Sequence, residues 1–168
     1  GEVANLQGGH HTAVDAHNVP GPLSRIPVMI GGGGERKTLR LVAQYADESN
    51  LLAEPKDVPR KLEALAAHCE AVGRDRSEIT VTYQTSAVIA PTKEQAQAEL
   101  DAAVAAIPEL AARAGGVILG SPDEVRPIYE RILASGVDGV TVNLPANGHV
   151  PGRVALLGET LAPVVNRS

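Results

Sequence analysis

Along the chain, short apolar runs or alternating positions typical of strands are followed by apolar residues at the helical spacing of three to four positions. The apolar run at residues 27–30 is typical of a buried parallel strand, and four glycines follow it directly. Apolar residues then recur at helical spacing over residues 39–46. A second strand pattern over residues 49–53 precedes another helical pattern that begins near Asp57. The first half of the chain therefore predicts strand, glycine turn, helix, strand and helix.

The second half of the chain repeats this alternation. Apolar and polar residues alternate along residues 79–89, which predicts a half-exposed strand. Thr92 with Gln95 forms a capping box ahead of an alanine-rich helical pattern. Residues 137–144 are an apolar strand candidate, and a last helical pattern follows them. Strands that alternate with helices predict right-handed crossovers and a parallel sheet.

Further capping residues mark where helices begin and end. Asp57 is expected to cap the N-terminus of its helix, and Gly73 is placed where a left-handed residue closes it. Ser121 with Glu124 forms a second capping box, with a proline at the first helical position. Three strands, near residues 28, 50 and 140, are expected to be fully buried. Three are too few to close a barrel of about eight strands, so the chain is expected to be incomplete.

Composition narrows the function classes. The 168 residues are 43% apolar and 21% charged, with a formal net charge of -5, as in a globular protein. The acidic balance, with three Tyr and neither Phe nor Trp, argues against nucleic-acid binding. Cys69 is the single cysteine and is expected to be buried. No segment has the length or apolar character of a membrane helix or signal peptide, so we expect a cytoplasmic protein with no membrane partner.

The clearest chemical feature is the glycine run Gly31, Gly32, Gly33 and Gly34, followed by Glu35. Glycines let backbone N–H groups approach an anion, and the following helix directs its positive end to the same point. The run is neither a P-loop nor a Gly-x-Gly-x-x-Gly dinucleotide motif. Two interpretations remain open from these residues: a phosphate-binding turn, or a tight strand-to-helix turn that binds nothing.

Other polar residues have weaker claims. Glu35 either contacts a ligand or complements its own helix, and Asn50 and Asn143 close two predicted strands as either cap or site residues. His149 lies in the loop after the last strand, where a contact with substrate or cofactor is open. His10, His11 and His17 lie close together in the sequence, but no paired carboxylate or cysteine completes a metal set, so no metal site is expected. No catalytic residue can be assigned.

Several blocks together resemble one family. Residues 27–50, which contain Gly-Gly-Gly-Gly-Glu-Arg-Lys-Thr-Leu, are similar to the late-barrel segment of luciferase-like oxidoreductases that use a flavin or F420. Successive blocks of that family resemble residues 9–11, 15–20, 68–75, 119–125, 136–140 and 156–163. The resemblance covers nearly the whole chain and is therefore more specific than the glycine run alone.

This resemblance implies the C-terminal portion of a (β/α)8 TIM-type barrel, an α/β fold that is incomplete as a single chain. Residues 1–27 would be a loop that leads into the barrel. Residues 28–168 would supply the last three barrel strands, with an insertion at about residues 79–105. Gly31–Gly34, Glu35 and Asn50 would bind the cofactor, which is F420 or alternatively FMN. The cofactor would carry hydride chemistry on an unknown small organic substrate.

The family's earlier barrel strands, which supply most of the substrate pocket, are not in this chain. Two function classes therefore stay open: part of a luciferase-like F420-dependent oxidoreductase, with an FMN-dependent monooxygenase as the variant, or a non-catalytic fragment or assembly module that keeps only the scaffold. Whether the chain by itself is an enzyme is left undecided. Exposed sheet edges favour a homo-oligomer or completion by another chain.

Overall fold

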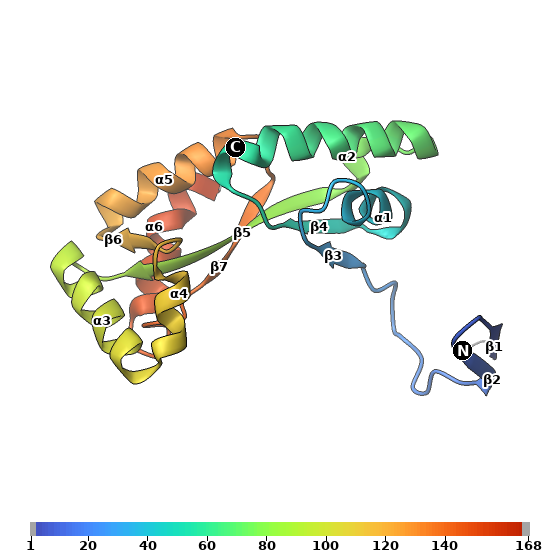
Figure 1. Cartoon of the computed structure of the whole chain (residues 1–168), viewed down its shortest axis with the longest axis horizontal. Helices are drawn as coiled ribbons and strands as arrows, with labels where there is room; N and C mark the ends of the chain where they lie inside the picture. Colours follow the sequence, from blue (N-terminus) through green and yellow to red (C-terminus); the bar gives the residue numbers. More distant parts are fainter. Residues whose placement is uncertain (1–2, 166–168) are drawn as a thin grey trace.

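The computed structural model describes residues 3–165, with side chains throughout except at residues 113 and 114. Strands and helices alternate from β3 onward (Figure 1). The strands are β1 Ala4–Gln7, β2 Thr12–Ala16, β3 Met29–Gly31, β4 Glu48–Leu51, β5 Thr80–Ile89, β6 Ile118–Gly120 and β7 Gly139–Asn143. The helices are α1 Thr38–Tyr45, α2 Val58–Val72, α3 Lys93–Ala106, α4 Ala111–Ala114, α5 Pro122–Ala134 and α6 Arg153–Val165, with short 3-10 turns at Pro55–Asp57, Arg76–Glu78 and Pro108–Leu110.

The central sheet is parallel and is organised around β5. Strand β4 pairs with β3 on one side and with residues 80–83 of β5 on the other. Strand β7 pairs with residues 82–86 of β5. Strand β6 pairs only with the last three residues of β5, beyond the stretch that β4 and β7 reach. The order β3-β4-β5-β7 thus places four parallel strands side by side, with β6 as an addition at one end of β5.

The sheet topology corrects the expected place of residues 79–89. They were expected to form a half-exposed strand inside an insertion, but they form β5, which pairs with β4, β6 and β7. Val81, Tyr83 and Thr85 are buried on one face, while Thr82 and Gln84 are half-buried on the other. The alternation assigned the residues to two faces correctly. The alternation could not show that β4 and β7 pair with this strand, because a period of two residues indicates which side chains are buried and not which strands are adjacent.

The strand at residues 27–30 also differs from expectation. It forms β3, a parallel strand, but Val28 and Met29 are 48% and 47% exposed instead of buried. Its only strand partner in the described part of the chain is β4, so one of its edges is unpaired there. Strand β7 is likewise half-buried along most of its length. Apolar composition indicated burial in a larger sheet than these residues make by themselves.

Residues 1–27 were expected to be a loop, but the part described contains an antiparallel hairpin. Strands β1 and β2 pair from Ala4 with Ala16 to Gln7 with Thr12. The hairpin stands apart from the sheet at the end of an extended segment (Figure 1). Val14 and Leu23 on this arm are largely exposed, so the arm contributes no core.

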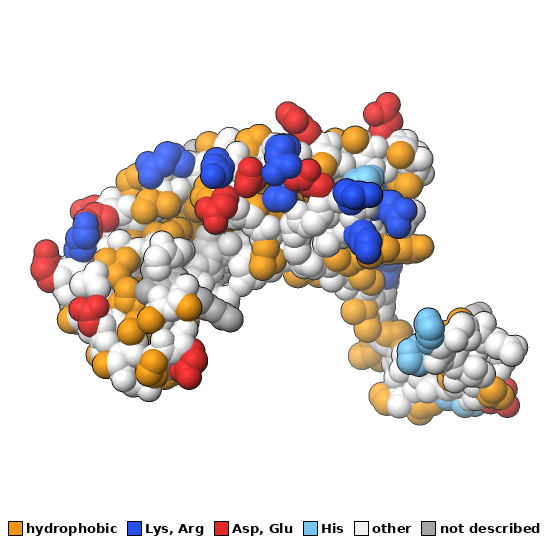
Figure 2. Space-filling model, in the orientation of Figure 1, with side chains coloured by type: hydrophobic (Ala, Val, Ile, Leu, Met, Phe, Trp, Pro, Cys, Tyr) orange, Lys and Arg blue, Asp and Glu red, His pale blue; other side chains and the backbone are white. Residues whose placement is uncertain are grey.

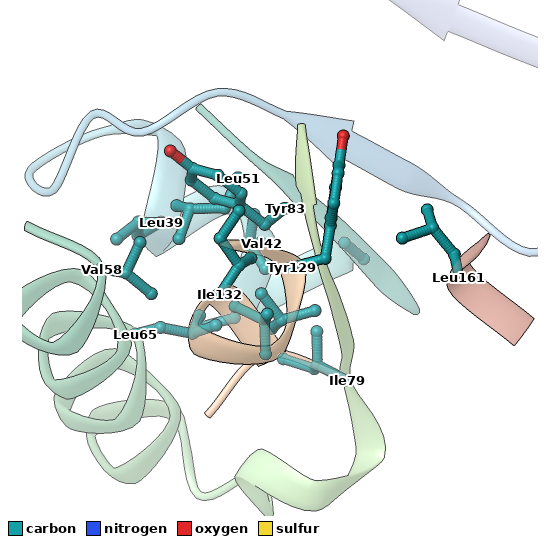
Figure 3. Packing of buried hydrophobic residues seen from close by; sticks show 14 of the residues in the cluster. Leu39, Val42, Leu51, Val58, Leu65, Ile79, Tyr83, Tyr129, Ile132 and Leu161 are labelled. Carbon is teal, nitrogen blue, oxygen red and sulfur yellow. The ribbon is translucent and has the colours of Figure 1, made fainter. Parts of the chain in front are cut away.

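One face of the sheet carries the hydrophobic core. Helices α1, α2, α5 and α6 pack on it and enclose side chains from β4 and β5 (Figure 3). The core includes Leu39, Val42, Leu51, Val58, Leu65, Ile79, Tyr83, Tyr129, Ile132 and Leu161. The Tyr129 hydroxyl pairs with the Thr85 hydroxyl at 2.9 Å, which satisfies both groups inside the core. Cys69 is also buried there, as expected, and burial raises the pKa of its thiol.

Helix ends agree only in part with the capping predictions. Ser121 and Glu124 form the predicted capping box, and Gly73 has the left-handed conformation at φ 69°. Thr92 accepts a hydrogen bond from the Gln95 amide, but the Gln95 side chain bonds Glu99 instead of completing the box. Asp57 makes no cap bond, because a 3-10 turn continues directly into α2. No helix within residues 3–165 is long and apolar enough to cross a bilayer.

Candidate functional site

The glycine turn lies where β3 ends and α1 is about to begin, at the carboxyl edge of the sheet. The Gly32 amide donates to the carbonyl of Asn50 at 2.9 Å, and Gly32 has φ 130°, which favours glycine. A Cβ on Gly33 would lie 2.0 Å from the carbonyl oxygen of Leu52. Glycine at position 33 is therefore required by the close approach of the chain after β4, independently of any ligand.

The amides that follow Gly32 are not used in hydrogen bonds by the part of the chain that the structure describes. Within residues 3–165, the N–H groups of Gly33, Gly34, Glu35 and Arg36 donate to no acceptor. They precede the first turn of α1, where the helix dipole favours negative charge. Unpaired N–H groups that follow one another at a helix start are the donor set that phosphate groups occupy. The turn thus has both a structural reason for one glycine and an unused donor set.

The carbonyl groups of the same turn are engaged by α2. The Lys61 ammonium donates to the Gly33 oxygen at 2.6 Å and to the Glu35 carboxylate at 3.3 Å. His68 Nε2 lies 2.8 Å from the Glu35 carbonyl oxygen. Arg60 pairs with the Glu35 carboxylate at 2.5 Å. The Glu35 side chain therefore faces α2, and its charge is compensated there by two cations.

Asn50 lies beside Gly31 in register and joins three strands across the uncovered face of the sheet. Its amide nitrogen donates to the Gln84 side chain at 2.9 Å. Its carbonyl oxygen accepts from the hydroxyl of Thr141 at 3.1 Å and from that of Thr82 at 3.3 Å. Both ends of the Asn50 side chain are thus bonded within the sheet, next to the glycine turn.

Two cavities open near the carboxyl ends of the strands. The larger, of about 830 Å³, lies between the segment after β4, the middle of β5, the start of β6 and α5. Its polar lining includes Glu54, Gln84 and Arg131. The smaller, of about 310 Å³, lies between the loop after β7, α3 and the 3-10 turn Pro108–Leu110. Ser86 lines both cavities, and the glycine turn lines neither.

The loop after β7 is held by a buried polar cluster. Asn147, which is 0% exposed, donates to the Ile89 carbonyl at 2.9 Å and to Glu99 of α3 at 2.7 Å. Arg153, at the start of α6, donates to the same carboxylate at 3.0 Å. The hydrogen bonds from Arg153 and Asn147 hold the pKa of Glu99 below its ordinary value. This cluster holds α3, the loop after β7 and α6 together.

A second polar contact ties the arm to the sheet. The Asp47 carboxylate accepts from the Val28 amide at 2.8 Å and pairs with Arg25. These two interactions, the Val28 hydrogen bond first, hold the pKa of Asp47 below its ordinary value. The extended segment is therefore anchored immediately before β3, and only the hairpin end of the arm stands apart.

Charged side chains lie mainly on the helix-covered side, over α1, α2 and α5, and the hollowed underside is mostly uncharged (Figure 2). Asn143 and His149 are both exposed at the end of β7 and in the loop after it. His10, His11 and His17 are exposed on the hairpin arm. Within the described residues, no group of three or more His, Cys, Asp or Glu side chains is placed to hold a metal ion.

Sequence reasoning missed several residues that the structure brings to this edge. Lys61 and His68 were not among the predicted site residues, yet they contact the glycine turn from α2. Gln84 and Ser86 were assigned to a solvent face, yet they line the cavities. The signal for the second pair was present, because polar positions that share a face with Asn50 on a parallel sheet belong to the same surface.

A comparison with known families decides the relationship of the chain. Residues 1–148 match the family described as luciferase-like monooxygenase. The chain belongs to this family. Its α/β fold with a parallel central sheet is the one seen in luciferase-like TIM-barrel enzymes, and the four adjacent parallel strands are part of such a barrel. No curated protein sequence matches the chain.

Solved structures of luciferase-like enzymes have the same fold at low identity. An F420-dependent secondary alcohol dehydrogenase in complex with an F420–acetone adduct has a TM-score of 0.75 and is 16% identical, covering 98% of this chain and 56% of its own. Riboflavin lyase with modified FMN and riboflavin has a TM-score of 0.68 at 16% identity, covering 96% and 48%. A coenzyme F420-dependent tetrahydromethanopterin reductase from Methanopyrus kandleri has a TM-score of 0.59 at 20% identity, covering 83% and 50%. The chain spans about half the length of these enzymes.

Proposed function

We propose that the chain is part of a luciferase-like oxidoreductase that uses F420, with the cofactor phosphate bound by the amides of Gly33, Gly34, Glu35 and Arg36. The observation that carries this proposal is that these four N–H groups make no hydrogen bond within the described residues. They lie at the carboxyl edge of a parallel sheet, where barrel enzymes bind cofactor and substrate. When bound, F420 would supply hydride transfer to or from a small organic substrate.

The choice of F420 as cofactor is supported by the amino-acid sequence of the turn. The run Gly-Gly-Gly-Gly-Glu-Arg-Lys-Thr-Leu resembles members of the family classed as F420-dependent. The likeness to the F420-dependent dehydrogenase agrees with this in fold. The uncovered face around Asn50 would form part of the barrel interior beneath the cofactor. The remaining barrel strands would come from further chain or from a partner, and the larger cavity would contribute to the substrate side.

The test compares two variants that differ in charge and hardly in size. Gly34 has no left-handed requirement, and a Cβ there would lie 2.9 Å from the Thr38 hydroxyl oxygen, so the Thr38 side chain must shift to the same extent in both variants. Gly34→Asp places a carboxylate beside the phosphate, whereas Gly34→Asn is its neutral counterpart of nearly equal size. We expect Gly34→Asp to bind F420 and FMN at least about tenfold more weakly than Gly34→Asn in fluorescence titrations, since like charges repel at short range.

Riboflavin, which is FMN without its phosphate, provides the internal control. The wild-type protein and Gly34→Asn should prefer FMN over riboflavin, and Gly34→Asp should lose this preference. If Gly34→Asp and Gly34→Asn bind FMN with equal affinity and also bind F420 with equal affinity, the glycine turn does not contact the cofactor phosphate. In that case the chain would keep the family's scaffold without this cofactor contact.

A further inference from the structure

Three consecutive carbonyl groups of the glycine turn have fixed partners. The Gly33 oxygen accepts from the Lys61 ammonium at 2.6 Å. The Gly34 oxygen accepts from the Leu39 amide of α1 at 3.0 Å. The Glu35 oxygen lies 2.8 Å from His68 Nε2, and because a carbonyl oxygen only accepts, Nε2 carries the proton. Helix α2 therefore provides two of the three donors, from side chains two turns apart.

The planarity of the peptide bond converts these contacts into directions for the amides. In a trans peptide, the C=O of one residue and the N–H of the next point in opposite directions. When Lys61 holds the Gly33 oxygen toward α2, the Gly34 N–H must point away from α2. His68 acts in the same way through the Glu35 oxygen on the N–H of Arg36. The bond from Leu39 fixes the N–H of Glu35 between them.

We propose that Lys61 and His68 are positioning residues that hold the N–H groups of Gly34 and Arg36 in the direction of the cofactor phosphate. This inference rests on the proposed function of the turn. The Lys61 side chain is only 13% exposed and already compensates Glu35, so its effect is exerted mainly through the Gly33 carbonyl. Donors that are aimed before the anion arrives require no reorganisation when it binds.

The fold itself does not depend on these two contacts. Helices α1 and α2 pack through the buried side chains of Leu39, Val42, Leu65 and Cys69. Loss of Lys61 or His68 would leave this packing in place and release only the carbonyls of the turn. The residues can therefore be changed while the helix pair stays folded, which makes their effect on the amides measurable.

The experiment follows the backbone amides of the turn by NMR in the intact, isotope-labelled protein while inorganic phosphate is added. In the wild-type protein, the Gly34, Glu35 and Arg36 signals should shift together and saturate. Lys61→Met and His68→Leu should weaken phosphate binding at least about tenfold each, the effect of losing a charged or well-placed hydrogen bond. Residual dipolar couplings should show altered N–H directions at Gly34 in Lys61→Met and at Arg36 in His68→Leu before phosphate is added.

Two variants separate positioning from general effects. His68→Gln retains an N–H donor at nearly the position of Nε2 and should restore both the affinity and the Arg36 direction. Lys56→Met removes an exposed lysine from the turn ahead of α2 and should leave phosphate binding within about twofold of wild type, because a distant exposed charge is screened. Unfolding midpoints measured for all variants show that the chain remains folded.

The possible outcomes separate the two proposals. If the wild-type amides do not respond to phosphate, the proposed function of the turn and this inference both fail. If they respond, but Lys61→Met and His68→Leu bind as tightly as wild type with unchanged N–H directions, the positioning role fails while the phosphate turn stands. Failure of His68→Gln to restore binding would likewise overturn the role assigned to the Nε2 donor.

Discussion

The two faces of the central sheet differ in what covers them. On one face, Val81 and Tyr83 of β5 and Leu51 of β4 lie under four helices and are almost inaccessible to solvent. On the other face, the Asn50 side chain donates a hydrogen bond to Gln84 across the strands, and both residues remain half-buried. The same strands supply both faces, so the difference is set entirely by alternate residues.

This contrast shows that helices cover one face of the sheet and that only this face is part of the hydrophobic core. The covered face has its helices and its apolar side chains, and it can exclude water without help. The open face has polar side chains that satisfy one another but bury little apolar area, so it gains little from the hydrophobic effect. Stability should therefore depend on the first face, and function on the second and on the turn at its edge.

The largest expected effect tests the covered face. Leu65→Ala removes a side chain that is 1% exposed, and we expect a loss of about 2–5 kcal/mol in the free energy of unfolding, from lost burial plus a cavity. Thr82→Ala, on the open face, should cost less than about 1 kcal/mol. Urea unfolding followed by circular dichroism gives both values. Similar losses in the two variants would mean that the faces do not divide the stability as described.

The next effect tests the glycine turn at the edge between the faces. Gly33→Ala brings a methyl group against the Leu52 carbonyl, and we expect a loss of about 1–3 kcal/mol by overpacking. Gly9→Ala, where a Cβ meets nothing within 4 Å, should be nearly neutral. Thermal unfolding of the two variants provides the comparison. A stable Gly33→Ala would show that the segment after β4 passes the turn at a greater distance.

The polar cluster of Glu99, Asn147 and Arg153 allows a test of stability against pH. Glu99→Gln should cost about 1.5 kcal/mol at pH 7, because hydrogen bonds from Arg153 and Asn147 lose their charged acceptor. The depressed pKa of Glu99 contributes stability that is present above its unfolded-state pKa of about 4.3 and is lost as the pH falls through the lower folded-state pKa. The difference between wild type and variant should therefore shrink below about pH 4.

The control for this pH test is Glu63→Gln, which changes an exposed glutamate on α2. Its free energy of unfolding should stay within about 0.5 kcal/mol of wild type at each pH, as for most surface substitutions. A constant difference between wild type and Glu99→Gln across the acid range would contradict the assigned pKa direction and locate the effect in packing alone.

The smallest effect tests the open face directly. Asn50→Ala removes hydrogen bonds to three neighbouring side chains, yet we expect a loss of only about 1 kcal/mol, because the released groups can reach water. Chemical unfolding measures the loss, and Asn50→Asp is a matched variant that retains the acceptor. A loss above about 3 kcal/mol would indicate that this face is covered in the folded protein under the conditions used.

The sequence was sufficient for some features that neighbouring residues decide, although the Asp57 cap and the complete Thr92–Gln95 box did not form. The Ser121–Glu124 capping box and the left-handed Gly73 formed as predicted, because each is decided by residues next to it in the chain. Alternation over residues 79–89 also assigned side chains to the correct faces. The position of that strand in the sheet was missed, because strand order depends on contacts between distant segments.

The candidate site divides in the same way. The glycine run was recognisable as a tight turn because glycine tolerates both the φ of 130° at Gly32 and the close approach of the Leu52 carbonyl at Gly33. Its contacts from Lys61 and His68 could not be predicted, since they depend on the packing of α2 against α1. The exposure of Val28 was missed for another reason, because an apolar run predicts burial but does not show which elements cover the strand.

Strand β5 is longer than its neighbours, and β6 attaches only to the end that β4 and β7 do not reach. The segment from α3 to β6 is attached at this projecting end, and it takes no part in the pairing of β5 with β4 and β7. Changes within this segment would therefore leave those strand pairings in place. Residues of this segment line both cavities. Substitutions there would therefore alter which ligands the cavities accept without changing the pairing of the other strands.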